Sequence, residues 1–220
     1  MNYEIRRWFG DSVMIFTIDN YESINKEIKD IIIKDVESSQ GMFATTTDIM
    51  GKDLVDNLHK NKNFDKLFKE IEKAMTQCLK EHEYNLDVID VYITKAWATL
   101  TQKDQFISEH RHSASHFSLV YYVEAEDQGN LVLKKTDPVG LFTPSSTQYF
   151  KEYNDHNIST ITYGSRTGDL VIFPSNMVHF TEVNKQENPR ISIGIDILLT
   201  MKEGITSEHN LPNPKTWKKI

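Results

Sequence analysis

The chain has 220 residues, 39% of them hydrophobic and 26% charged, which is enough to fold as one domain with a sizeable core. Its net charge of −7 argues against bulk binding to nucleic acid. No apolar run approaches the roughly 20 residues of a membrane span, no secretory signal opens the chain, and the single cysteine excludes an internal disulfide. We therefore expect a cytoplasmic protein that does not enter membranes.

The first third of the chain predicts short strands followed by two helices. Apolar bursts at residues 3–9 and 13–18 are typical of strands. Helical spacing of apolar residues then predicts one helix over 21–36 and another over 64–79. Cys78 lies on the apolar stripe of the second helix, which indicates a thiol in the core rather than a reactive one.

From residue 86 the pattern changes to strands. Apolar or alternating segments bounded by turn residues predict strands at 88–100, 105–110, 117–125, 129–135, 158–163, 169–173, 179–183 and 190–200. Strands that follow two helices are the order expected of a double-stranded β-helix (jelly-roll) supported by N-terminal helices. The sequence thus predicts a mainly β protein with N-terminal helices and a jelly-roll, cupin-like core.

The expected layout is a single domain over residues 1–220. Residues 1–85 hold the N-terminal strands and supporting helices, 86–200 the β-helix core, and 201–220 a C-terminal extension. The connection at 138–157 is long and rich in turn residues, and loops of this kind are usually functional or mobile, so we expect a lid over the barrel mouth. The N-terminal strands and the extension are the expected elements of a homodimer.

Three histidines form the first candidate site. His110 and His112 stand one residue apart, and residues i and i+2 of an extended strand project from the same face, so both imidazoles can converge on one point. His179 follows an apolar strand ended by Pro174, a turn that can bring it back across the barrel. Together these residues predict a metal site. Polar, hydrogen-bonded barrel histidines are the alternative.

Arg190 and Ser192 form the second candidate site, because they share one face of the last predicted strand. A guanidinium fork and a hydroxyl bind a carboxylate well, and an arginine directed into a barrel would otherwise be an unpaired buried charge. We therefore expect an anionic ligand. Tyr121 and Tyr122 point to opposite faces of their strand, so only one can face the pocket; Tyr121 is the candidate for a further ligand contact, and Trp97 is expected near the site.

Three segments, HRHSASHFSLVYYV, GNLVLKKTDP and GDLVIFPSNMVHFTEVNKQENPRISIGIDI, resemble the core of a 2-oxoglutarate- and Fe(II)-dependent oxygenase, of a branch common in phages and marine bacteria. The resemblance spans residues 91–199. It implies that His110 and His179 hold iron and that Arg190 and Ser192 bind the distal carboxylate of 2-oxoglutarate. It also implies that O2 is consumed, that succinate and CO2 are released, and that an unidentified small molecule or side chain is hydroxylated.

One position departs from the family pattern. Most of the superfamily supplies a carboxylate two residues after the first histidine, where this chain has His112. We interpret the site as a three-histidine centre, with Glu109 and Asp104 as weaker candidates for a carboxylate ligand; Glu109 would point away from His110. A neutral imidazole in place of a carboxylate raises the net charge of the site by one, which weakens retention of Fe(II) and opens the site to zinc or nickel.

Two alternatives remain open at this stage. One is a cupin-like three-histidine metalloenzyme that uses no 2-oxoglutarate. The other is a non-catalytic jelly-roll with a binding or structural role. The pair of Arg190 and Ser192 favours the oxygenase over the cupin-like enzyme, because that enzyme requires no carboxylate clamp at that place. The metal content of the purified protein would distinguish the non-catalytic alternative.

Overall fold

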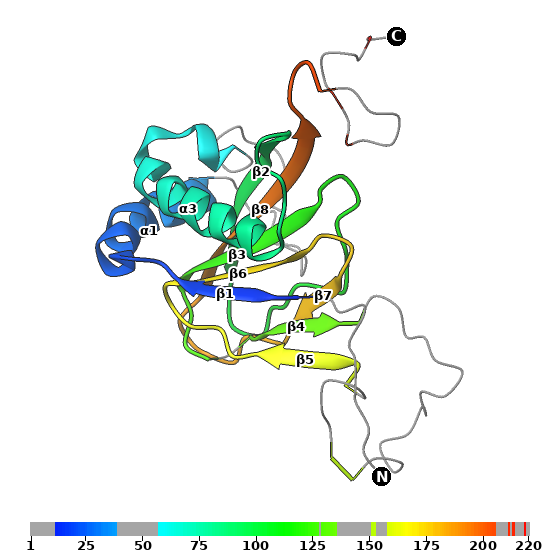
Figure 1. Cartoon of the computed structure of the whole chain (residues 1–220). Coiled ribbons are helices and arrows are strands. Elements are labelled where there is room, and N and C mark those ends of the chain that lie inside the picture. The colour runs from blue at the N-terminus through cyan, green and yellow to red at the C-terminus, as the bar shows by residue number, and fades with distance from the viewer. Residues whose placement is uncertain are drawn as a thin grey trace.

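A computed structural model describes residues 12–38, 57–127, 129–135, 151–152 and 158–205, and residues 211, 213 and 218 (Figure 1). The predicted strand at 3–9, the predicted lid at 138–157 apart from residues 151–152, and most of the extension at 201–220 lie outside this description. Among the helices of the described residues, none is long and apolar enough to cross a membrane.

The elements follow the predicted order. They are β1 (Met14–Thr17), α1 (Tyr21–Ser38), the short 3-10 helices η1 (Leu58–Lys60) and η2 (Lys62–Phe64), α3 (Asp65–Glu81), β2 (Ile89–Thr101), β3 (Phe117–Glu124), β4 (Leu131–Lys134), β5 (Thr160–Tyr163), β6 (Asp169–Pro174), β7 (Val178–Thr181) and β8 (Arg190–Met201). Both predicted helices are confirmed, and so is every predicted strand of the β core except that at 105–110.

The segment at 105–110 is irregular rather than a strand. It lies beside β7 and the residues that follow β7, but the two segments are joined only by isolated backbone hydrogen bonds. Examples are Thr181 N to Ile107 O at 3.0 Å and Asn184 N to Gln105 O at 2.9 Å. His110 alone forms a bridge, to His179. The prediction of a strand here is therefore wrong, because the hydrogen bonds are too few and too scattered to form a ladder.

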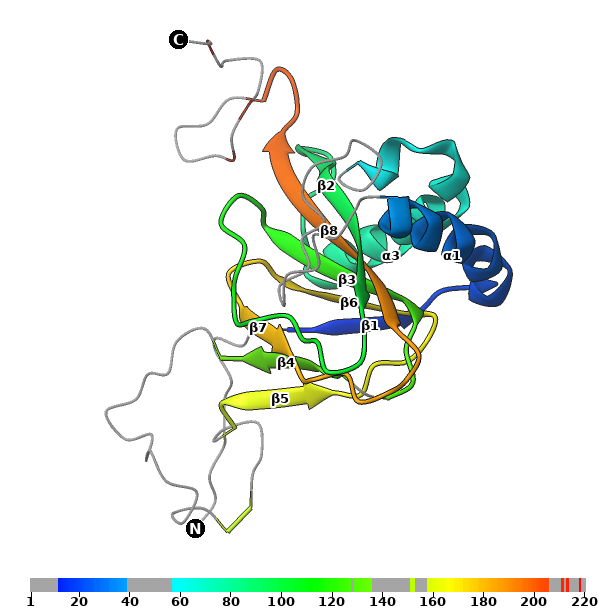
Figure 2. The ribbon, with the colours of Figure 1, turned by 180° about the vertical axis from the view of Figure 1, so that it is seen from behind.

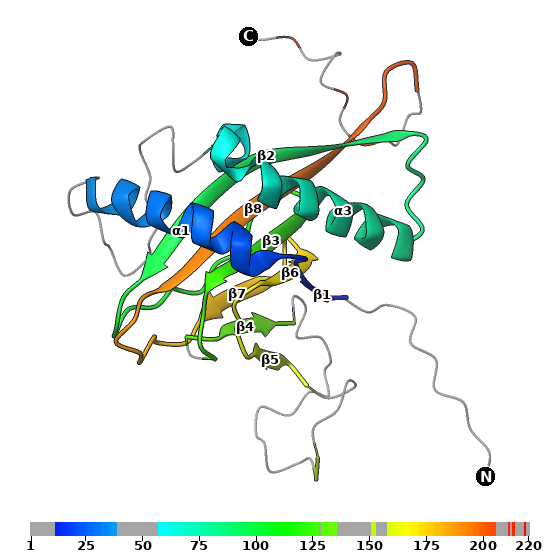
Figure 3. The ribbon, with the colours of Figure 1, turned by 90° about the vertical axis from the view of Figure 1, so that its left-hand side faces the viewer.

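The strands form two antiparallel sheets. The larger has the order β1-β6-β3-β8-β2, and the smaller has the order β5-β4-β7. Figures 2 and 3 show α1 and α3 against one face of the larger sheet, with β4 and β5 away from the helices. Two facing antiparallel sheets, one of them buttressed by helices, confirm the predicted jelly-roll.

Alternation along β8 gives the larger sheet two different faces. The odd-numbered residues Ile191, Ile193, Ile195 and Ile197 are buried in the same core as Ile28 of α1 and Leu67, Ile71 and Met75 of α3. The even-numbered residues Arg190, Ser192, Gly194 and Asp196 face the space between the sheets. Successive residues of a strand point to opposite sides, so one strand serves both the core and the cavity.

Cys78 is buried in the core on the inner face of α3, as the sequence predicts. Burial raises the pKa of its thiol to about 11, because the thiolate would lose its hydration there.

We expect iodoacetamide at pH 8 to alkylate Cys78 only after denaturation, as measured by intact mass. The denatured protein is the matched control, and rapid alkylation of the native protein would contradict this account.

Candidate metal centre

A cavity of about 450 Å³ lies between the two sheets. Its walls include alternate residues of β2 and β8, residues of β3 and β7, and the irregular segment that follows β2. Five residues predicted from the sequence line it, namely His110, His112, His179, Arg190 and Ser192. The fold thus brings together two candidate sites that are far apart along the chain.

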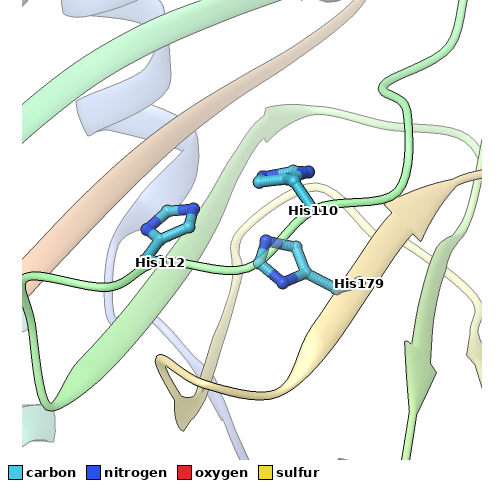
Figure 4. Close-up of side chains that lie close together, drawn as sticks. All are labelled: His110, His112 and His179. Carbon is cyan, nitrogen blue, oxygen red and sulfur yellow. The ribbon is translucent and has the colours of Figure 1, made fainter.

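The three histidines gather at one point of this cavity. Their ligating nitrogen atoms all lie within 4.8 Å of one another, and no other such group of His, Cys, Asp or Glu occurs in the described residues. The ring centroids are 4.2 Å apart for His110 and His179, 5.3 Å for His110 and His112, and 5.2 Å for His112 and His179. Figure 4 shows His110 and His112 on one segment and His179 on β7.

Backbone hydrogen bonds hold the two segments together. His110 and His179 exchange a reciprocal pair of bonds, each with an N to O distance of 2.9 Å, and the backbone N–H of His112 donates to Ser175 O at 2.9 Å. The predicted convergence of the histidine pair is therefore confirmed, although the pair lies on an irregular segment.

Each imidazole is oriented through its Nδ1 atom. In His110 and His179 this nitrogen lies 2.8 Å and 2.9 Å from the carbonyl oxygen two residues earlier in the chain. In His112 it lies 2.5 Å from Asp196 Oδ1. An oxygen acceptor at Nδ1 keeps the proton there, so each Nε2 presents a lone pair, as a metal ligand requires.

The two weaker carboxylate candidates lie elsewhere. Glu109 pairs with Lys134 at 2.5 Å and Asp104 pairs with Lys185 at 2.9 Å, and both carboxylates are more than half exposed. Neither lines the cavity. Within the described residues, the donor set is therefore three imidazoles.

Arg190 is buried, with 3% of its surface exposed, at another part of the cavity. Its guanidinium donates to Gly129 O and, at 3.1 Å, to Thr101 Oγ1, while its Nε has no partner among the described residues. No described carboxylate forms an ion pair with it. Burial lowers its pKa, because a desolvated cation without a counter-ion is costly. The Nε atom is therefore a donor with no acceptor among the described residues.

Gly129 makes room for this guanidinium. Its φ of +63° favours glycine, and a Cβ there would lie 3.2 Å from a terminal nitrogen of Arg190. Sequence reasoning missed this position, as it missed Thr101 and Asp196. The signal for Asp196 was present, because it continues the even-numbered series that starts at Arg190.

The prediction for Tyr121 is wrong. Tyr121 faces the helices, where its hydroxyl donates to Asn25 Oδ1 at 2.5 Å, and Tyr122 lines the cavity instead. Pairing with β8 decides this, since Tyr122 lies opposite Ser192, a cavity residue. Trp97 lines the cavity as expected, with its ring centroid 5.7 Å from that of His112.

A family model described as "Putative 2OG-Fe(II) oxygenase" matches residues 95–196, a span that contains all three histidines, Arg190 and Ser192. The match covers just under half of the chain and agrees with the resemblance seen in the sequence. Oxygenases of this family use Fe(II), 2-oxoglutarate and O2, and the three clustered histidines of this chain are donors that suit such a metal. No curated protein sequence matches the chain.

Solved structures share the fold of this chain at low sequence identity. AviO1 from Streptomyces viridochromogenes Tue57 has a TM-score of 0.58 and 13% identity, with 93% of each chain covered. A Pseudomonas putida prolyl-4-hydroxylase has a TM-score of 0.51 and 13% identity, covering 84% of this chain and 86% of that one. A Burkholderia pseudomallei oxidoreductase of the 2OG-Fe(II) oxygenase family has 18% identity but a TM-score of 0.37, covering 57% of this chain. The chain spans 48% of that protein's length.

Burial lowers the pKa of His179 to about 4, so its ring is neutral at pH 7. The unfolded chain takes up this proton below about pH 6.5. The metal-free protein should therefore lose about 3 kcal/mol of stability as the pH falls from 7 to 4. Urea unfolding at several pH values checks this. A His179→Gln variant should lack this component, and identical pH slopes for both proteins would contradict it.

Replacing Tyr121 by Phe removes its hydrogen bond to Asn25 and leaves a buried amide oxygen without this donor. We expect a loss of about 1–2 kcal/mol in the free energy of unfolding, with unchanged binding of metal and 2-oxoglutarate. Tyr92→Phe, at a tyrosine on β2 that is 49% exposed, is the matched control and should be nearly neutral. Weaker binding of 2-oxoglutarate to Tyr121→Phe would restore the original prediction.

Proposed function

We propose that this protein is a 2-oxoglutarate-dependent hydroxylase with a three-histidine centre, in which His110, His112 and His179 hold Fe(II) and Arg190 with Ser192 holds the distal carboxylate of 2-oxoglutarate. The observation that carries the proposal is the position of Arg190. A buried guanidinium that has no carboxylate partner among the described residues lines the same cavity as three imidazoles with available Nε2 atoms.

Different residues of the cavity have different roles in the proposed reaction. The Nδ1 contacts fix the three rings, so the Nε2 atoms can bind a metal without rearrangement. Arg190 offers two-point recognition of a carboxylate, and Ser192 lies on the same face of β8. Leu131, Phe173 and Phe180 are apolar parts of the wall and limit access of water. When bound, Fe(II) and 2-oxoglutarate supply the activation of O2, with release of succinate and CO2.

Several finer statements belong to the same proposal. We propose hydroxylation as the reaction, on a small molecule or a side chain of a larger molecule; the Pseudomonas putida neighbour is titled a prolyl-4-hydroxylase, which supports this class. We also propose a cytoplasmic location, no bulk binding of nucleic acid, a homodimer, and one domain over residues 1–220. The net charge of −7 and the single cysteine support the location and the absence of nucleic acid.

The alternatives fit less well. A cupin-like enzyme without 2-oxoglutarate gives no reason for a buried Arg190 in the cavity with no carboxylate beside it in the part of the chain that the structure describes. A non-catalytic jelly-roll gives no reason for three imidazoles held with their Nε2 atoms free. The family match over residues 95–196 also favours the oxygenase.

Anaerobic titration with Fe(II) and then 2-oxoglutarate tests the proposal through the weak visible absorption band of the chelate. The band should appear in the wild type and be absent in His179→Ala. Arg190→Met should weaken 2-oxoglutarate binding about 100-fold, because it removes a buried charged partner. Arg166→Met is the control, since Arg166 is 68% exposed and lies outside the cavity. Bound iron without a band would contradict the role of 2-oxoglutarate.

A further inference from the structure

We propose that Asp196 is a positioning residue that supplies, from behind His112, the negative charge missing from the three imidazoles. The inference rests on the three-histidine centre proposed above. Asp196 is the one carboxylate among the described residues that line the cavity. It acts through the ring of His112 and is not itself placed as a ligand.

The contact between the two residues is short and sheltered. Asp196 Oδ1 lies 2.5 Å from His112 Nδ1, and the side chains are 16% and 15% exposed. The carboxylate therefore accepts the Nδ1 proton and leaves Nε2 for the metal. A carboxylate that accepts from a ligating histidine makes the opposite nitrogen a stronger donor and fixes the ring orientation.

Serine hydroxyl groups extend this contact into a buried network. Ser118 Oγ lies 3.0 Å from both Asp196 Oδ1 and His112 Nδ1, and 3.0 Å from Ser175 Oγ. Ser115 donates to Ser175 Oγ at 2.8 Å. Ser118 and Ser175 are each 1% exposed. Because Ser175 also accepts the backbone N–H of His112, the same network holds this histidine at its ring and at its main chain.

Regular sheet pairing fixes the carboxylate in place. Asp196 lies on β8 opposite Ser118 of β3 and Lys95 of β2, so strands on both sides determine its position. Most of the superfamily has a carboxylate among the metal ligands. In this chain the corresponding carboxylate would be that of Asp196, which lies behind His112 and does not bind the metal itself. With Asp196 included, the total charge around the metal is the same as for two histidines and one carboxylate.

The alternative explanation is that Asp196 only orients His112 through a hydrogen bond. Measuring the effect of Asp196→Asn in the wild type and in a His112→Asp variant distinguishes this explanation from a role of the negative charge. We expect Asp196→Asn to weaken Co(II) binding 10- to 100-fold in the wild type, measured by visible spectroscopy of the metal-free protein titrated with Co(II). In a His112→Asp background a carboxylate already lies beside Asp196. There Asp196→Asn should strengthen Co(II) binding about tenfold, because it relieves the repulsion between two like charges.

The controls keep the outcomes distinct. Asp90→Asn makes the same change of charge on β2 outside the cavity and should leave Co(II) affinity unchanged. Thermal unfolding of each metal-free variant reports whether it folds. Proton NMR gives a second readout that does not use the His112→Asp variant. The downfield resonance of the His112 Nδ1–H in the wild-type protein should move upfield in Asp196→Asn.

The possible results are decisive. Opposite signs of the Asp196→Asn effect in the two backgrounds support the charge role. The inference is overturned if Asp196→Asn changes Co(II) affinity in the same direction in both proteins, or by less than twofold in the wild type. In that case the wild-type protein still binds Co(II), and the proposed three-histidine centre stands. Wild-type protein that binds no Co(II) overturns the proposed metal centre and this inference with it.

Discussion

The two-residue period of β8 is the constraint on which the rest of the structure depends. Its odd-numbered isoleucines are buried in the core shared with α1 and α3, and its even-numbered residues line the cavity. A shift of one residue in register would exchange the two sets, placing a guanidinium and a carboxylate in the apolar core. Stability and function therefore require the same register, and the apolar burial that stabilises the fold also holds the cavity residues in place.

This period also sets the distance between the two parts of the centre. Arg190 and Asp196 are six residues apart, which is about 20 Å along an extended strand. Arg190, the proposed anion-binding residue, and Asp196, the hydrogen-bond partner of His112, thus lie at opposite ends of one rigid element. Gly194 stands between them, where a Cβ would lie 2.4 Å from the ring of Trp97, so the indole can pack directly on the strand. Rigid strands position a constellation more exactly than loops do.

Much of this could be predicted from the sequence, because strand period and helix period are local properties. The helices, most strands, the three histidines and the pair of Arg190 and Ser192 follow from spacing and side-chain chemistry. The choice between Tyr121 and Tyr122 does not, since it depends on which residue of β8 lies opposite, and pairing is a tertiary property. The same holds for Gly129, whose neighbour Arg190 is distant in sequence. The irregular segment before His110 was missed because its pattern is strand-like but its hydrogen bonds are few.

The reciprocal backbone bonds between His110 and His179 have a consequence for how the centre is assembled. Main-chain hydrogen bonds join the two segments, and the Nδ1 contacts orient the rings. The three imidazoles that we propose as ligands are therefore positioned by contacts within the chain, so that binding of an ion would cost little further conformational entropy. Such contacts would let the proposed centre exchange its metal while the chain stays folded.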